Sequence, residues 1–326
     1  MPFKNTALFL EECLTSIQRQ SHENWELIAV DDGSTDHSFS IVKKYADIDD
    51  RIHVFKNNGI GIIKALQLAY SKSTGKYVTR MDSDDIMPYF KLTSMRNQLR
   101  KHGRGHIALG LVKYFSNFGI SDGYYKYERW LNKLTQQGNN FKEIYKECVI
   151  PSPCWMVHKL DFDLCGAFNS NVYPEDYDLA FRFYEHGLTC LKTDKVLHYW
   201  RDYSERTSRT HEHYSDNRFL DLKMHYFIKL HLDTTKTQVL WGAGTKGKFM
   251  ARKLQKAGAN FIWICNNPKK WNKKIYGHEL KKVESIDGLF NVQHLISIAE
   301  PTAQTDIQKI MDIKQLESLK DYFFFC

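Results

Sequence analysis

Long apolar stretches are absent from this sequence. None of its hydrophobic runs approaches the roughly 20 residues that a membrane-spanning helix needs. The seven cysteines are odd in number, widely spaced, and include no Cys-x-x-Cys pair, which favours reduced thiols over disulfides or a zinc site. The sequence therefore predicts a cytoplasmic protein without structural disulfides.

Acidic residues are scarce in the last third of the chain, although 46 Lys and Arg outnumber 38 Asp and Glu only modestly overall, for a formal charge of +8. A solvated helix face accounts for such a run, and contact with an anionic substrate or an anionic membrane surface would also suit it. Nucleic acid ranks last as a partner, because no aromatic-rich binding motif accompanies the lysines. We expect no nucleic-acid partner and keep a peripheral location at the inner face of the membrane open. The basic residues are Lys246, Lys248, Arg252, Lys253, Lys256, Lys269, Lys270, Lys273, Lys274, Lys281 and Lys282.

The length of 326 residues with 42% hydrophobic content favours two domains. Helix and strand signals alternate from residue 5 to about 115, which predicts an α/β fold with a doubly wound sheet. The polar link at residues 233–237 places the boundary near 234, so the domains are 1–233 and 234–326. Residues 116–150 show no regular period. Strands are expected at 25–30, 51–55, 76–81, 107–115, 154–157 and 261–265, and helices at 10–17, 39–46, 62–70, 88–103 and 213–231.

Two acidic clusters, at residues 31–36 and 82–85, each follow a hydrophobic strand-like run. Because the carboxyl ends of parallel strands share one edge of a sheet, both clusters should lie along the edge where open α/β sheets bind ligands. So many carboxylates in one place repel one another, and a divalent cation bound through oxygen relieves that repulsion. The clusters therefore suggest a metal and a phosphate ester. A plain surface loop, or a helix-capping turn at residues 31–36, is the alternative.

A third acidic pair, Glu175 and Asp176, opens an expected helix in which Leu179 and Phe183 share a face. Acidic side chains favour a helix N-terminus through the macrodipole, so the pair also has a structural explanation. Taken in order, residues 30–36, 80–85 and 174–179 resemble the motifs of family-2 glycosyltransferases of the GT-A fold. The resemblance covers about residues 1 to 210.

The resemblance implies roles for individual residues. Asp32, with Asp31 beside it, would contact the base and ribose of a sugar nucleotide. The pair Asp82 and Asp84 would meet the ribose and the metal-bridged diphosphate and bind the metal, Mg²⁺ or Mn²⁺, with Asp84 as the favoured direct ligand. Asp176 would be the general base, with Glu175 as the alternative, since a sugar hydroxyl is too weak a nucleophile without one. Arg201 would steady the leaving phosphates, or else form a structural salt bridge. His198 is expected to pack in the fold rather than bind metal.

The implied function is a metal-dependent, inverting glycosyltransferase. It would move a sugar from a nucleoside diphosphate donor, UDP in the first instance, to a hydroxyl of a glycan or lipid-linked acceptor. A nucleotidyltransferase of similar fold is a rival, but residues 3–15 lack its Gly-rich basic loop. A non-catalytic nucleotide-sugar-binding protein is another.

One feature departs from the family pattern, in which an apolar strand runs into a Met-Pro-x-x-Asn segment. This chain starts at that segment, Met1 to Asn5, so we expect the first strand to be missing and Met1 to be an internal methionine. That strand would lie centrally, between the strands at 25–30 and 76–81, and its loss would leave two ladders unpaired.

The second domain carries Gly242-x-Gly244-x-x-Gly247 between an expected strand and helix, the context of a dinucleotide-binding fingerprint. Asn266 stands near the end of the next strand, where an acidic residue would bind a ribose, and this weakens an NAD-dependent oxidoreductase interpretation. The segment to Gly277 resembles small Rossmann-like domains found ahead of sugar O-acyltransferases. A structural or partner-binding module and a bound small ligand both stay open, and Phe323 is expected in a final buried strand.

Overall fold

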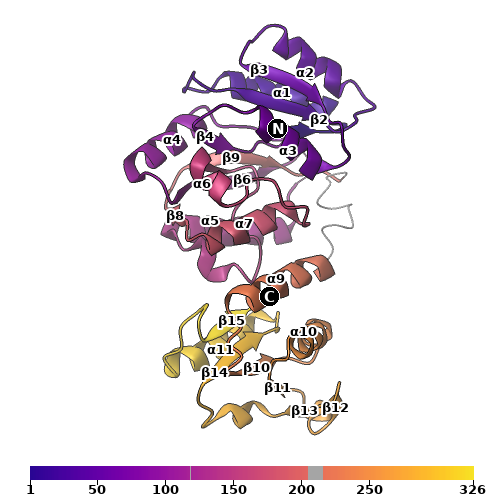
Figure 1. The fold of residues 1–326 in the computed structure, drawn as a ribbon, viewed down its shortest axis with the longest axis vertical. Helices are drawn as coiled ribbons and strands as arrows, with labels where there is room; N and C mark the ends of the chain where they lie inside the picture. Colours follow the sequence, from indigo (N-terminus) through magenta and orange to yellow (C-terminus); the bar gives the residue numbers. More distant parts are fainter. Residues whose placement is uncertain (118, 205–215) are drawn as a thin grey trace. The chain divides into compact units, whose positions relative to one another are not determined.

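The computed structural model describes residues 1–117, 119–204 and 216–326, which form two compact units (Figure 1). The first comprises Met1–Phe141 and Cys148–Tyr214, and the second Lys142–Glu147 and Ser215–Cys326. Helix α9 (Asp216–Leu230) thus groups with the second unit, whereas the sequence places it ahead of the boundary. The domain limits at 233/234 stay a prediction.

Most elements of the first unit lie where the sequence predicts them. In chain order they are β1 (Pro2–Phe3), α1 (Ala7–Gln18), β2 (Leu27–Asp31), α2 (Ser38–Ala46), β3 (Ile52–Lys56), α3 (Ile62–Lys72), β4 (Tyr77–Thr79), α4 (Lys91–His102), β5 (His106–Leu109), β6 (Leu111–Phe115), α5 (Asp122–Gln137), η1 (Asn140–Glu143), β7 (Trp155–His158), α6 (Lys159–Leu164), α7 (Glu175–Glu185), β8 (Thr189–Leu191) and β9 (Val196–Arg201).

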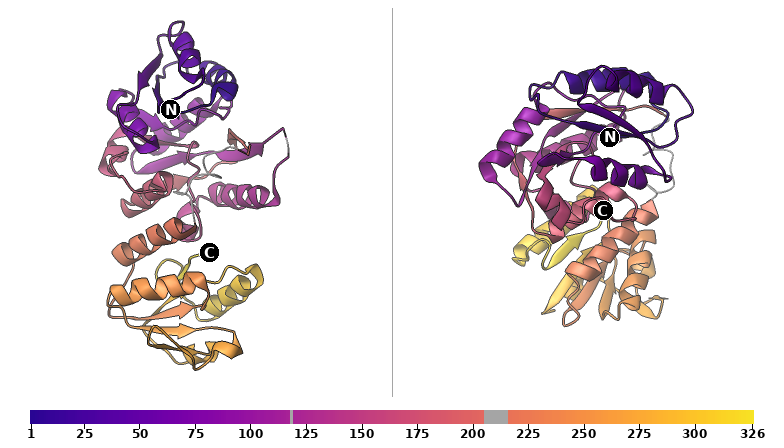
Figure 2. Two further views of the ribbon diagram at one scale, coloured as in Figure 1. Left: turned by 90° about the vertical axis from the view of Figure 1, so that its right-hand side faces the viewer. Right: turned by 45° about the horizontal axis from the view of Figure 1, so that its top comes forward.

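Strands β1, β2 and β3 form a parallel sheet that is covered on both faces. Leu27 and Ala29 of β2 belong to the hydrophobic cluster that α1 and α2 cover, whereas Ile28 and Val30 belong to the cluster of α3. Figure 2 (right) shows α1 and α2 lying across this sheet. Every residue of β2 is buried, as expected of a strand between two helical layers, and the predicted doubly wound arrangement is confirmed.

Three local predictions were wrong. The strand expected at 107–115 is two strands, β5 in the sheet β4-β7-β5-β8 and β6 paired with β9. They are separated at Gly110, where a Cβ would lie 2.4 Å from that of Leu197 and 2.7 Å from Cys154 Sγ, so only glycine allows this approach. The segment without a regular period contains α5. Helix α4 begins at Lys91, three residues after Pro88.

The edge between β2 and β4 holds a cavity of about 590 Å³, lined by residues of both strands, among them Ile28 and Val78. Strand β1 has two residues, and Pro2 and Phe3 pair with Val30 and Asp31. In the described residues β2 and β4 belong to different sheets. The central strand expected ahead of Met1 stays a prediction.

The second unit is a parallel sheet in the order β13-β11-β10-β14-β15, with β12 antiparallel at one edge. This is the strand order of a doubly wound nucleotide-binding fold. The final strand contains Phe323, as predicted, and Tyr145 from the Lys142–Glu147 segment packs against Phe227 and Phe323. The elements are α9, β10 (Thr237–Trp241), α10 (Thr245–Lys256), β11 (Phe261–Ile264), η3 (Pro268–Lys270), β12 (Lys274–Ile275), β13 (His278–Lys281), η4 (Val283–Ile286), β14 (Val292–Ile296), α11 (Pro301–Ile313) and β15 (Tyr322–Phe324).

Candidate active site

The second acidic cluster forms a tight turn after β4, which we call the acidic turn (residues 82–85). The Asp82 carboxylate accepts a hydrogen bond from Arg80 Nε at 3.0 Å, and Asp84 Oδ2 accepts one from the Tyr203 hydroxyl at 2.9 Å. Asp84 is buried, and Asp85 has no exposed surface. The turn is therefore held by neighbouring side chains and is not a loose surface loop.

The first acidic cluster is held mainly by backbone N–H groups. Asp31 is buried and accepts the Ser34 N–H at 2.9 Å. Asp32 accepts the Gly61 N–H at 2.9 Å and the Asn57 side-chain amide at 2.7 Å. Asp36 accepts N–H groups at the starts of α1 and α2, so the predicted capping role falls to Asp36. The contact of Asp31 and Asp32 with a nucleotide stays a prediction.

Arg80 joins the acidic turn to the third acidic pair. Besides Asp82, its guanidinium binds Glu175 Oε1 at 3.0 Å, although 95 residues separate Arg80 from Glu175 in the chain. The side chain is only 7% exposed, so this ion pair is shielded from water and specifies geometry more strongly than a surface pair. Arg80 belongs to the second motif, residues 80–85, but the sequence alone assigns it no role. A cation at the end of a strand that leads into carboxylates was the available signal.

Asp176 has the electrostatics of a general base. It lies in the first turn of α7, beside Glu175, and its carboxylate accepts the Tyr177 N–H at 2.8 Å. Desolvation, followed by the negative charge of Glu175, raises the pKa of Asp176 from an ordinary 3.8 to about 7, while Arg80 opposes the shift. A carboxylate with a pKa near the working pH is deprotonated in a large fraction of the molecules and is still basic enough to take a proton from a hydroxyl. Glu175 is engaged by Arg80, and the role of Asp176 as general base stays a prediction.

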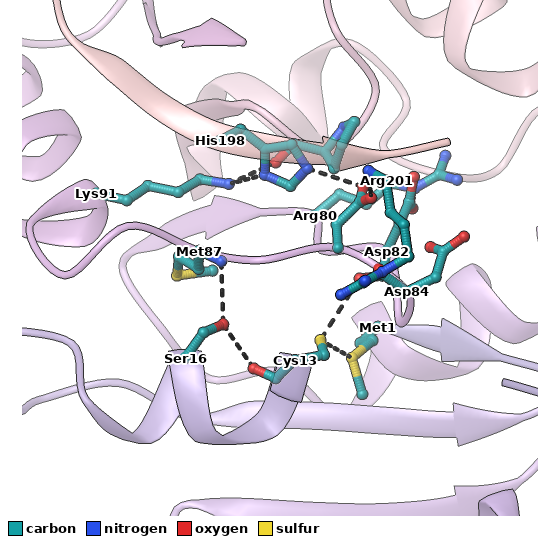
Figure 3. A network of polar contacts seen from close by, with 12 residues as sticks. Met1, Cys13, Ser16, Arg80, Asp82, Asp84, Met87, Lys91, His198 and Arg201 are labelled. Carbon is teal, nitrogen blue, oxygen red and sulfur yellow. Dashed lines mark hydrogen bonds and ion pairs between the residues drawn. The ribbon is translucent and has the colours of Figure 1, made fainter. Parts of the chain in front are cut away.

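Arg201, at the end of β9, forms the salt bridge that sequence reasoning offered as its alternative role. Its Nη2 binds Glu12 at 2.5 Å, and its Nε donates to the backbone carbonyl of Asp84 at 2.7 Å. The guanidinium also stacks over Phe9 and Phe115. These contacts place a cation directly against the acidic turn (Figure 3). Contact with phosphate stays a prediction. Residues 205–215, which follow this part of the chain, lie outside the described residues.

Behind the acidic turn, Lys91 and His198 connect to Asp85 through buried hydrogen bonds. His198 is fully buried, which confirms the prediction that it packs in the fold. Sequence reasoning assigned no role to Lys91, because a lysine in the first turn of a helix ordinarily faces solvent.

The donor set of the acidic turn suits a hard cation that is shared with a substrate. Across the described residues, no group of three or more His, Cys, Asp and Glu side chains is arranged to hold a metal ion by itself. Asp82 and Asp84 offer carboxylate oxygens on one turn, which are the ligands of Mg²⁺ and Mn²⁺. Mg²⁺ is commonly held by one or two carboxylates together with substrate phosphates, and this turn fits that arrangement.

The family model for glycosyl transferase family 2 matches residues 1–164, about half of the chain. The chain belongs to glycosyl transferase family 2. Among curated family-2 relatives, glycosyltransferase GlyG of Streptococcus pneumoniae is 33% identical over 124 residues, which cover 38% of this chain and 40% of the relative. The chain spans 24% to 40% of the length of this and two other curated relatives.

Solved structures show that this family-2 chain has the GT-A fold. The mannosyltransferase PcManGT from Pyrobaculum calidifontis, in complex with GDP-Man and Mn²⁺, aligns with a TM-score of 0.52 at 17% identity, over 78% of this chain and 72% of that one. TarS residues 1–349 of S. aureus, in complex with UDP, align with a TM-score of 0.50 at 18% identity, over 78% and 69%. The α/β GT-A fold predicted from the motifs is confirmed.

The strand ends of the second unit differ in chemistry from those of the first. Gly242 has a φ of +97°, and Lys270 Nζ donates to the carbonyl of Ala243 at 2.9 Å.

Among the described residues, no helix is long and apolar enough to cross a membrane.

Proposed function

We propose that this chain is a metal-dependent, inverting glycosyltransferase that moves a sugar from a nucleoside diphosphate donor to a hydroxyl of a glycan or lipid-linked acceptor. The observation that carries the proposal is the double ion pair of Arg80, which holds the acidic turn and the start of α7 within the span of one guanidinium. The groups that would bind a donor and deprotonate an acceptor therefore belong to one site.

Each acidic group has one task in this proposal. Asp84, with Asp82, would hold Mg²⁺ or Mn²⁺, and Asp31 and Asp32 contact the base and ribose of the donor. A cation held there would supply positive charge to the diphosphate leaving group. Arg201 adds a second positive charge on that side.

Asp176 takes the proton of the acceptor hydroxyl as its oxygen attacks the anomeric carbon. Direct attack from the face opposite the leaving diphosphate inverts the configuration at that carbon. UDP is the favoured nucleotide, supported by the UDP complex of TarS. The GDP-Man complex of PcManGT has the same fold, so the fold alone does not select the base.

A lipid-linked acceptor would bring the chain to a membrane. Helix α10 carries five basic residues, of which Lys253 pairs with Asp221 and Arg252 lies over the Tyr276 ring. We propose that the others allow peripheral contact with anionic lipid, each adding about 1 kcal/mol near such a surface. Co-sedimentation with vesicles of anionic or neutral lipid tests this, and equal binding to both would contradict it.

The central test is release of nucleoside diphosphate from a panel of UDP- and GDP-sugars with Mn²⁺ or Mg²⁺. We expect Asp176→Asn to lower kcat by about 10²- to 10⁴-fold, the usual contribution of a general base. Asp84→Asn should abolish the metal-dependent rate. Glu185→Gln, at the other end of α7, is the matched control and should keep wild-type turnover.

Two outcomes would contradict parts of the proposal. Turnover that survives both Asp176→Asn and Asp84→Asn would refute the assigned roles, whereas a metal-independent rate would refute only the role of Asp84. Binding of a nucleotide sugar without turnover across the panel would support the non-catalytic alternative.

A further inference from the structure

Three ionisable side chains form a buried chain of hydrogen bonds behind the acidic turn. Lys91, His198 and Asp85 each have no exposed surface. Lys91 Nζ lies 3.1 Å from His198 Nδ1, and His198 Nε2 lies 2.8 Å from Asp85 Oδ2. Lys91 Nζ also donates to the carbonyl of Pro153 at 2.6 Å. Figure 3 shows Lys91 and His198 extending toward the acidic turn.

The donors and acceptors of these three side chains define one arrangement of protons. A lysine ammonium has three donors and no acceptor, so the His198 Nδ1 that faces it must accept. The proton of the neutral imidazole then resides on Nε2 and is donated to the Asp85 carboxylate. The imidazole thereby links a buried cation to a buried anion.

This series of hydrogen bonds ends at the backbone around Asp84, the proposed metal ligand. The second oxygen of Asp85 accepts the Arg201 N–H at 2.8 Å, and Arg201 Nε donates to the carbonyl of Asp84. Asp85 is also the next residue after Asp84. A shift of His198 would therefore move the Asp84 carboxylate and the Arg201 guanidinium together.

A contribution to folding stability alone does not explain this buried hydrogen-bond series. Buried ionic groups pay a desolvation cost, and well-packed apolar residues of similar volume are often as stable or more so. Burial lowers the pKa of Lys91, which is the signature of that cost. Partners behind metal ligands, in contrast, commonly orient the ligands and tune the affinity of the site.

We propose that Lys91 and His198 are positioning residues that hold Asp84 and Arg201 in the geometry that binds the diphosphate and cation of the donor. This inference deepens the proposed function and rests on it. Neither residue touches the substrate; both act through Asp85.

The test measures binding of UDP, and separately of GDP, with Mn²⁺ by isothermal titration calorimetry. We expect Lys91→Met, which keeps the length of the side chain and removes its charge, to weaken binding by about 10-fold or more. Met95→Ala is the matched control, because Met95 is fully buried one turn further along α4 and belongs to the hydrophobic core. Its loss of volume should lower Tm and leave the affinity unchanged.

The wild-type protein supplies a second measurement that does not depend on a variant folding. Nitrogen-15 NMR of the imidazole should show His198 neutral and protonated at Nε2. A proton at Nδ1 would overturn the arrangement, as would a folded Lys91→Met variant that binds UDP or GDP with Mn²⁺ within twofold of wild type. If the wild-type protein binds neither nucleotide with Mn²⁺, the proposed function itself fails, and the two failures are thus distinguishable.

Discussion

Both units of this chain are built from strands and helices, and they carry different side chains at the ends of their strands. In the first, β2 and β4 lead into carboxylates: backbone N–H groups hold Asp31 and Asp32 at the end of β2, and Arg80 holds Asp82 after β4. In the second, β10 leads into a glycine turn and β11 into Cys265 and Asn266. Both sets follow strands of an α/β unit, yet among these described strand ends only the first set offers carboxylates, the oxygen ligands that carry the negative charge a divalent cation requires. The comparison teaches that the backbone supplies the location and the side chains supply the chemistry.

The largest effect expected from this difference is a pH dependence of kcat/KM that arises from Asp176 in the first unit. Because Asp176 acts deprotonated and its pKa is raised to about 7, kcat/KM should be flat above pH 8. It should be about 100-fold lower at pH 5, falling tenfold per unit below the pKa. Initial rates at saturating Mn²⁺ measure this, with Glu185→Gln as the control. A rate that stays level to pH 5 would remove Asp176 as the base.

A substitution in the second unit tests whether its glycine turn matters only for packing. A Cβ at Gly247 would lie 2.1 Å from the Gly242 carbonyl oxygen, whereas nothing lies within 4 Å of one at Gly244. Gly247→Ala should therefore cost about 1–3 kcal/mol or more of stability, as overpacking does.

Gly244→Ala is the matched control for that substitution and should leave Tm close to wild type. Thermal unfolding monitored by circular dichroism measures both variants. Binding of UDP with Mn²⁺ below the transition should be the same in both. If Gly247→Ala weakens that binding while the fold is intact, the division of roles between the two units is wrong.

The smallest expected effect is a gain in stability when the base is removed. The pKa of Asp176 is higher in the folded than in the unfolded chain, so the folded state binds more protons and loses stability as pH rises from about 4 to 7. Asp176→Asn abolishes this loss. We expect it to stabilise the protein by about 1–2 kcal/mol at pH 8, less than the full shift implies because the side chain is partly exposed. Urea unfolding at pH 8 and pH 5 measures it, and a gain that does not shrink at pH 5 would contradict the cause.

Much of the fold was predictable because hydrophobic period and turn residues act locally. The helices at α1, α2 and α3 and the strands at β2 and β3 lie within a few residues of their predicted positions. The predictions that failed depend on distant contacts. The break at Gly110 exists because Leu197 and Cys154 come close from elsewhere in the chain, and α5 carries aromatic residues whose partners, such as Trp200, are remote.

The candidate site divides in the same way. The order of its acidic motifs is a property of the sequence, and it was enough to predict the family and the GT-A fold. The roles of Arg80, Lys91 and His198 were not predictable, because each role depends on a partner 95 to 113 residues away.

The sequence by itself determined which acidic residues this protein carries at its strand ends, and therefore which chemistry it is equipped for. Only the tertiary structure decided how they are shared. It commits Glu175 to Arg80, raises the pKa of Asp176, and ties Asp84 to Arg201. The physical reason is that desolvation and ion pairing depend on distance in space, which no local pattern of residues encodes.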